Sequence, residues 1–188
     1  MTTNTATISP TAQPTAQPAG PIEADADLQA KILRTIDKKS FLTLATTSAA
    51  GFGHAAGVIY EAVDGTLWFH TMRNSRKARN ISANPRVGVT IPFRKLPVGP
   101  PFTIQFQASA RLVDIDSPEI ADLVGRGRLK SITGHGELEL PGSCFVAIEP
   151  QGSINSFGPG ASLIDLIRDP LNSGARTFRL VDARSVER

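Results

Sequence analysis

The residues best suited to chemistry in this sequence are positive charges gathered in one stretch. From Gly65 to Val113 the chain contains no acidic residue. The same span holds the basic residues Arg73, Arg76, Lys77, Arg79, Arg86, Arg94, Lys95 and Arg111. The formal net charge of the whole chain is only +3, so positive charge is concentrated here. Such a cluster favours an anionic ligand, with a solvated basic helix face as the alternative interpretation.

The centre of this basic stretch predicts a short helix with cations in its first turn. Asn74 or Ser75 suits the N-cap position, and Asn84-Pro85 ends the helix. Free backbone N–H groups of the first turn would then lie beside the Ser75 hydroxyl and the charges of Arg76 and Lys77. Amide donors, a hydroxyl and two cations together suit a phosphate dianion. We therefore predict a phosphate site at the start of this helix.

Length and composition limit the classes of protein to consider. The chain has 188 residues, of which 40% are hydrophobic, enough for one domain with a substantial core. No apolar run approaches the ~18–20 residues needed to span a membrane, and the N-terminus lacks the pattern of a secretory signal. The single Cys144 cannot form an internal disulfide, which fits a reducing cytoplasm. We expect a cytoplasmic protein without a membrane partner.

The chain divides into a low-complexity tail and one folded domain. Residues 1–24 are rich in Thr, Ala, Pro and Gln, with little apolar surface to bury, and predict a disordered tail. Residues 25–188 form the single predicted domain. It begins with an amphipathic helix ending near Lys38-Lys39, because Leu28, Ile32 and Ile36 recur at helical spacing.

Most of the domain shows strand signals. Strands are predicted over residues 41–46, 55–62, 66–71, 87–91, 102–113, 144–149 and 177–181, and further helices over residues 117–128 and 163–167. Asp64-Gly65 is a strong hairpin turn. Residues 102–113 alternate between apolar and polar side chains, as in the wall of a barrel. The pattern predicts a mainly β protein, a small antiparallel barrel with a few helices, and excludes a dinucleotide-binding βαβ fold.

These features together resemble the pyridoxamine 5′-phosphate oxidase-like family of FMN-binding split barrels. The segments that carry the resemblance are residues 41–46, the Asp64-Gly65 turn, His70-Thr71, the run from Asn74 to Ile81, and Asn84-Pro85-Arg86-Val87. The resemblance implies a split antiparallel barrel that forms a homodimer, with the flavin in a groove between the subunits. It also implies an FMN-dependent oxidoreductase that acts on an unknown small molecule.

The resemblance assigns the cofactor-binding residues. Arg76 and Lys77 would bind the cofactor phosphate with help from Ser75, and His70-Thr71 would contact the flavin or its ribityl chain. The strand from Ala56 to Tyr60 would offer backbone groups to the edge of the ring. The candidates are Ala56, Val58, Tyr60, His70, Thr71, Ser75, Arg76 and Lys77.

We expect neither catalytic side chains nor a metal site. A flavin carries out hydride transfer itself, so the protein only has to hold it, orient a substrate and tune the ring. His54, His70 and His135 lack metal-ligand spacing, and no Ser-His-Asp arrangement is visible.

Departures from the family leave other functions open. The strand from Ala55 to Tyr60 lacks the arginine and lysine that the true pyridoxamine phosphate oxidase brings to its cofactor, and Trp68 is the only tryptophan. The residues that bind the cofactor in this family are therefore largely matched, but those that bind the vitamin substrate are not. The alternatives are an F420-dependent oxidoreductase on the same fold, and a cofactor or haem carrier with a histidine ligand. A nucleic-acid-binding barrel is a weaker alternative, and we expect no nucleic-acid partner.

The segment from Gln151 to Gly160 is rich in glycine and predicts a loop. It would either act as a substrate gate, with Phe157 covering the substrate, or simply connect a strand to the next helix.

Overall fold

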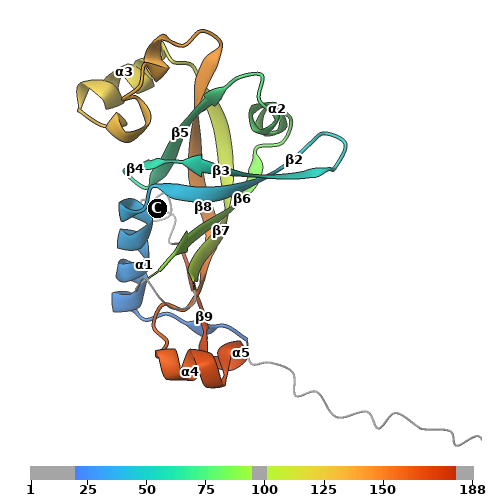
Figure 1. Cartoon of the computed structure of the whole chain (residues 1–188), viewed down its shortest axis with the longest axis vertical. Coiled ribbons are helices and arrows are strands. Elements are labelled where there is room, and N and C mark those ends of the chain that lie inside the picture. Colours follow the sequence, from blue (N-terminus) through green and yellow to red (C-terminus); the bar gives the residue numbers. More distant parts are fainter. Residues whose placement is uncertain (1–19, 95–100, 181–188) are drawn as a thin grey trace, which may run out of the picture.

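A computed structural model of the chain describes residues 20–94 and 101–180. Its centre is a barrel of antiparallel strands (Figure 1), as the sequence predicts. The barrel strands are β2 (Phe41–Thr47), β3 (Gly53–Ile59), β4 (Glu61–Val63), β5 (Thr66–Met72), β6 (Arg86–Phe93), β7 (Phe102–Val113) and β8 (Ser143–Phe157). Hydrogen bonding runs in the order β3-β2-β6-β7-β8-β5-β4. Because β3 continues into β4 with only Tyr60 between them, this order closes on itself.

The closure is incomplete between β3 and β5. β4 pairs with β5 from Glu61↔Trp68 to Val63↔Thr66. Continuing this register would place Ile59 opposite His70, but the two strands no longer pair there. The edge of β3 and the end of β5 have separated, and a gap opens in the barrel wall.

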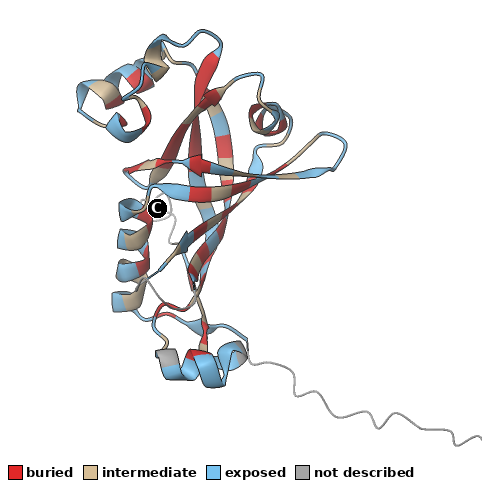
Figure 2. Ribbon diagram, viewed as in Figure 1, coloured by how far each residue is buried: buried red, intermediate tan, exposed pale blue. Residues whose placement is uncertain are grey.

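The alternating strands bury their inward side chains in the barrel (Figure 2). Leu42, Leu44, Phe69, Ile104 and Ile148 are fully buried in this main core. A second cluster lies beneath α3 (Pro118–Gly125) and the short turns η1 (Lys130–Ile132) and η2 (Glu137–Glu139). Its members include Trp68, Ile120, Leu129 and Phe145.

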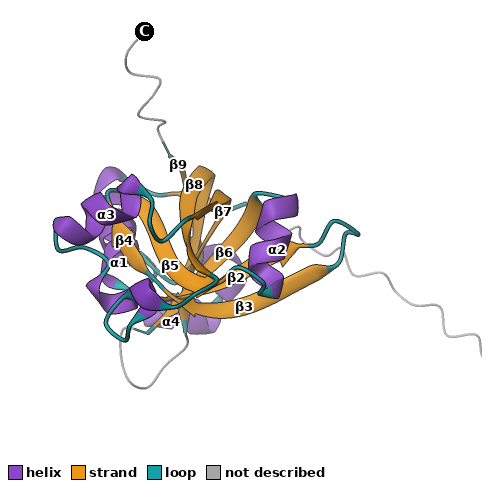
Figure 3. Cartoon of the chain, turned by 90° about the horizontal axis from the view of Figure 1, so that it is seen from above, coloured by secondary structure: helices purple, strands orange, loops and turns teal. Residues whose placement is uncertain are grey.

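The larger helices lie outside the barrel. α1 (Ala26–Lys38) packs Ile32 and Ile36 against it, and the Tyr60 hydroxyl donates to the Ile36 carbonyl at 2.6 Å. Seen from above, α1 and α3 lie on one side, and α2 (Arg76–Ala83) lies on the opposite side (Figure 3). None of the helices in residues 20–94 and 101–180 is long and apolar enough to cross a membrane.

Part of the predicted tail forms a strand. β1 (Ile22–Glu23) pairs in parallel with β9 (Ala175–Arg179), and Ala24 is buried. The prediction of disorder up to residue 24 is therefore wrong for residues 22–24, because the edge of β9 supplies backbone partners that composition does not reveal. Residues 1–19 of the predicted tail lie outside the described residues. The last predicted strand, 177–181, starts earlier, and Val181 is not described. α4 (Leu163–Arg168) and α5 (Pro170–Ser173) precede it.

The glycine-rich segment is mostly strand. β8 continues to Phe157 and pairs with both β7 and β9. The predicted loop, either as a substrate gate or as a simple connector, is therefore not what the structure shows. The pairing register shifts between Phe106 and Gln107, whose partners are Ile154 and Gln151. Gly152, with φ +70°, occupies this irregularity. The glycine marks a β-bulge in a long strand, a role that its side-chain-free backbone suits.

Candidate cofactor site

The gap in the barrel wall holds a hollow of about 340 Å³. β3 forms one side of it, the end of β5 and the first turn of α2 form another, and the segment between α3 and β8 forms the third. The hollow is lined by Gly57, Val58, Ile59, His70, Lys77, Ser131, Ile132, His135 and Glu137.

The edge of β3 presents unpaired backbone groups to this gap. In an antiparallel ladder, hydrogen-bonded and non-hydrogen-bonded residue pairs alternate. Tyr60 donates its N–H to the Ser40 carbonyl on the β2 side. The backbone groups of Ile59 and Gly57 must therefore point away from β2, towards the hollow. An edge of this kind can hydrogen-bond a flat heterocycle.

The structure places one of the three predicted β3 residues on the hollow. Val58 lines the hollow, but Ala56 and Tyr60 are not among the lining residues. Burial, with the charge of Asp37, raises the pKa of Tyr60, whose ring lies in the core. Gly57 and Ile59 lie within the predicted stretch from Ala56 to Tyr60 but were not among the named candidates, and both line the hollow.

His70, which lines the hollow, carries an unpaired polar atom. Its Nε2 is buried and has no hydrogen-bond partner among the described residues. The ring packs edge-on against Phe145, with 5.5 Å between the ring centroids. Burial lowers the pKa of His70 and outweighs the opposing charge of Glu137, so the imidazole is mainly neutral at pH 7. A buried nitrogen without a partner is unfavourable unless a ligand or water completes it.

The predicted helix is confirmed as α2, with Ser75 as its N-cap. The Ser75 hydroxyl accepts from the Ala78 N–H at 3.3 Å and lies 3.2 Å from the Thr71 hydroxyl. These contacts place Thr71 and Ser75 at the helix start rather than on the surface of the hollow. Lys77 lines the hollow, whereas Arg76 lines a separate one on the other side of the helix start. The assignment of both cations to one phosphate stays a prediction.

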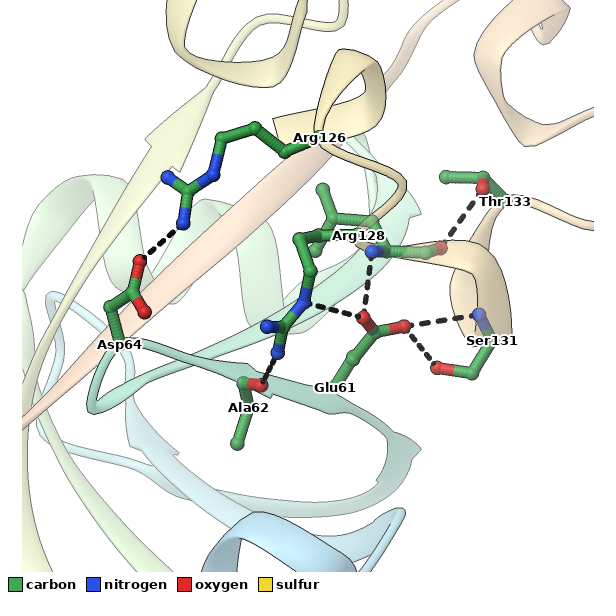
Figure 4. Close-up of polar contacts among 8 residues, drawn as sticks. Glu61, Ala62, Asp64, Arg126, Arg128, Ser131 and Thr133 are labelled. Atoms are coloured by element: carbon green, nitrogen blue, oxygen red, sulfur yellow. Dashed lines mark hydrogen bonds and ion pairs between the residues drawn. The ribbon is translucent and has the colours of Figure 1, made fainter. Parts of the chain in front are cut away.

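The far wall of the hollow is held by one carboxylate (Figure 4). Glu61 accepts hydrogen bonds from the Leu129 N–H at 2.7 Å, the Ser131 N–H at 3.1 Å and the Ser131 hydroxyl at 2.7 Å. Arg128 lies 3.7 Å from the same carboxylate and donates to the Ala62 carbonyl at 2.9 Å. Burial alone would raise the pKa of Glu61, but the Ser131 and Leu129 hydrogen bonds and the Arg128 charge lower it overall.

This anchoring fixes a segment that the sequence analysis treated only as a polar loop. Leu129 is fully buried with φ +65°, a strained conformation for a leucine that the surrounding contacts maintain. The segment supplies Ser131, Ile132, His135 and Glu137 to the hollow. The His135 N–H donates to Glu137 at 2.7 Å, and this hydrogen bond lowers the pKa of Glu137. The hollow therefore has a cation, Lys77, and an anion, Glu137, on different walls.

Comparison with protein families identifies the group to which this fold belongs. Residues 28–153 match the family of pyridoxamine 5′-phosphate oxidase, over more than half of the chain. The chain belongs to the pyridoxamine 5′-phosphate oxidase-like family. The matched stretch includes β3, β5 and α2 and the whole wall anchored by Glu61. Comparison with curated proteins gives no match in sequence.

Solved structures share the fold of this family member at low sequence identity. The heme storage protein HutZ from Vibrio cholerae is 19% identical with a TM-score of 0.58, over 68% of this chain and 92% of HutZ. A heme binding protein from Mycobacterium smegmatis is 16% identical with a TM-score of 0.58, over 75% and 57%. A FAD-binding protein from Mesorhizobium loti is 15% identical with a TM-score of 0.54, over 70% and 90%. These similarities establish the fold.

Proposed function

We propose that this family member is a flavin-dependent oxidoreductase that holds FMN in the gap between β3 and β5. The observation that carries the proposal is the open edge of β3 beside a hollow that His70 and Lys77 also line. The isoalloxazine ring has an edge of alternating N–H and C=O groups, which is complementary to a free strand edge. Lys77 supplies a cation within reach of the phosphate. F420 shares these chemical features and is the alternative cofactor.

When bound, the flavin would supply the hydride-transfer chemistry. The chain's own residues have binding and positioning roles. Gly57 and Ile59 would orient the ring through their backbone groups, and neutral His70 would offer one hydrogen bond without adding charge. The Glu61-anchored wall would keep Ser131, His135 and Glu137 at a fixed distance from the ring, on the side where a small substrate can enter.

The absorption spectrum of the purified protein tests this proposal. We expect the two visible bands of an oxidised flavin, either as isolated or after addition of FMN or F420, and their bleaching by a chemical reductant. Titration with FMN should quench the flavin fluorescence at a stoichiometry of one per chain. If the protein binds neither FMN nor F420, the assignment is wrong.

Haem binding is the second candidate. Two imidazoles, His70 and His135, line the same hollow, and HutZ and the Mycobacterium smegmatis protein are haem binders by name. A haem protein would show a sharp Soret band after addition of hemin. Loss of that band in His70→Ala, together with no flavin binding by the unmodified chain, would favour this candidate.

We also propose a homodimer through the outer face of β2, β3 and β6. This face is uncharged along β2 and β3 and exposes Phe41 and Ile59, which are 48% and 61% exposed. A hollow of about 650 Å³ lies beside it, over β2, β6, β7 and β8, with only uncharged residues in its lining. Ile59 belongs both to this face and to the cofactor hollow, so a second copy would add a wall to the site. Light scattering should give a dimer for the native chain and a monomer for Ala45→Glu, with Ala49→Glu at the hairpin tip as the control.

A further inference from the structure

The cofactor hollow carries charges on two different walls. Lys77 of α2 is the cation among its lining residues, and Glu137 of η2 is the carboxylate. The two side chains do not form an ion pair with each other, although both belong to the described part of the chain. Each charge is therefore available to a different part of a ligand.

Glu137 keeps a negative charge on the far wall. The His135 N–H donates to its carboxylate at 2.7 Å, and this hydrogen bond lowers the pKa of Glu137. The His135 Nδ1 lies 3.6 Å from the same carboxylate, a contact that is an ion pair only when the imidazole is protonated. No lysine or arginine of residues 20–94 and 101–180 pairs with Glu137. Its side chain is 22% exposed, so water screens the charge less than at an open surface.

The chain fixes the position of Glu137 without a ligand. Gly136 has φ +87°, and this left-handed turn lets the His135 N–H reach the Glu137 carboxylate. Leu138, the next residue, packs against the core cluster beneath α3. The first part of the same wall is anchored by Glu61 (Figure 4). A carboxylate held in this way loses little freedom when a ligand binds to it.

Ser131 adds a second acceptor to the far wall. Its hydroxyl donates to Glu61 at 2.7 Å, and its N–H donates to the same carboxylate at 3.1 Å. With its hydrogen used in this way, the hydroxyl oxygen can only accept a further hydrogen bond. Ser131 and Glu137 both line the hollow, so the wall offers acceptors to a ligand that brings donors.

The proposed cofactor uses the other walls of the hollow. With the flavin ring on the edge of β3 and its phosphate at Lys77, the polar groups left for a substrate lie on the far wall. An anionic substrate would be repelled by Glu137 and by the cofactor phosphate. Arg128, at the base of the wall, lies 3.7 Å from Glu61 and is already paired. A cationic substrate is attracted by the charge of Glu137, and its N–H groups match the acceptors of the wall.

We propose that the far wall selects a small organic cation as the substrate, with Glu137 and Ser131 accepting hydrogen bonds from its charged N–H groups. Protonated amines and amidines belong to this class. The inference rests on the proposed flavin site and names the substrate class of that site. Glu137 has a binding role here, because the flavin supplies the hydride-transfer chemistry.

Benzamidine, benzamide and benzoate test this proposal, because they share a planar shape but are positive, neutral and negative at neutral pH. Each is titrated into the chain saturated with FMN or, if only that binds, F420, and the change in the visible spectrum gives its dissociation constant. We expect benzamidine to bind about five- to tenfold more tightly than benzamide, the scale of one charged contact at a partly exposed site, and benzoate to bind most weakly. Acetamidine, acetamide and acetate form a smaller set with the same three charges, in case the benzene ring does not fit.

Substitutions at η2 assign the preference to one side chain. Glu137→Gln should remove the preference for the cation, and Glu137→Lys should reverse it in favour of the anion. Glu139→Gln is the matched control, because Glu139 is an exposed residue of the same turn and does not line the hollow. It should keep the preference of the native chain.

Four results would overturn the proposal. A preference for the anions, or no binding of either amidine, would show that the far wall does not select a cation, while the flavin assignment stands. An unchanged preference in Glu137→Gln would remove this carboxylate from the substrate site. An equal loss of preference in Glu139→Gln would show that the overall charge of η2, rather than the contact with Glu137, attracts the cation. If the chain binds neither FMN nor F420, the proposed function is wrong, and the substrate class is wrong with it.

Discussion

Arginines on the two sides of the barrel have opposite surroundings. Around α3 they meet carboxylates: Arg111 lies 2.6 Å from Glu119, and Arg126 lies 2.9 Å from Asp64. Around α2, Arg76 and Arg79 have no such partner within residues 20–94 and 101–180. The acid-free span from Gly65 to Val113 contains α2, so α2 has no carboxylate close to it in sequence, whereas α3 lies outside this span and carries acidic residues of its own.

This contrast separates charges that hold the structure together from charges that are free to bind. The Glu61–Arg128 contact holds a wall of the hollow, so it stabilises the folded chain rather than a bound ligand (Figure 4). Arg76 and Arg79 of α2 form no ion pair within the described residues, and their positive charges repel one another. Substitutions on the α2 side should therefore change ligand affinity, and substitutions on the α3 side should change stability.

The largest expected effect is that of Arg76→Ala combined with Lys77→Ala. Charged hydrogen bonds to phosphate contribute on the order of 1.5–3 kcal/mol each, so flavin affinity should fall by roughly a hundredfold or more. The melting temperature should stay unchanged or rise slightly, because repulsion between like charges is relieved. Fluorescence titration and thermal melting measure the two quantities.

Arg34→Ala with Lys38→Ala is the matched control for this double variant. It removes the same charge from exposed positions of α1, across the barrel from α2. Its flavin affinity should equal that of the native chain. Native-like affinity in the α2 double variant would show that the basic helix face is only solvated.

The next effect is expected at Glu61. Glu61→Gln keeps the shape of the side chain but loses the charge and one acceptor oxygen, leaving donors of Ser131 or Leu129 unpaired. We expect a loss of about 1–3 kcal/mol in the free energy of unfolding. Amides 129–131 should exchange hydrogen faster, while amides of β7 stay protected. Unchanged exchange at these amides would mean that the wall is held by its apolar packing alone.

The features that the sequence predicted correctly depend on residues close together in the chain, and the features that it did not predict depend on residues far apart. β7, Phe102–Val113, was predicted to the residue because alternation is a local signal. The cap at Ser75 was likewise local. The wall around Ser131 was not predictable, because its anchor, Glu61, lies 70 residues away in the chain. The bulge at Gly152 had a local signal, but the glycine alone did not distinguish a bulge from a loop.

A smaller effect is expected in the pH dependence of stability. The pKa of Glu61 is lowered in the folded chain, so the folded state binds fewer protons than the unfolded state. The stabilisation is present above the unfolded pKa of about 4.3 and is lost as pH falls through the lower, folded pKa. Denaturant titrations at several pH values measure the free energy of unfolding of the native chain and of Glu61→Gln. The difference between the two should shrink below about pH 4. Other carboxyls with lowered pKa values, such as Glu119, remain in both chains and cancel in the difference. If the difference in the free energy of unfolding did not change with pH, the charge of Glu61 would not be the cause of the stabilisation.

The smallest effect is expected at Arg126, two residues before Arg128. Arg126 contacts Asp64 and Asp122, at 2.9 Å and 3.5 Å, but all three side chains are exposed. Water screens such pairs, and ordering the long side chain offsets most of the remaining attraction. Arg126→Ala should therefore leave the denaturation midpoint and flavin affinity unchanged within error. Arg128→Ala should lower the midpoint measurably, because this arginine also donates to the Ala62 carbonyl beneath the wall. Equal destabilisation by the two substitutions would show that total charge around α3, rather than the specific anchoring of the wall, stabilises this side of the barrel.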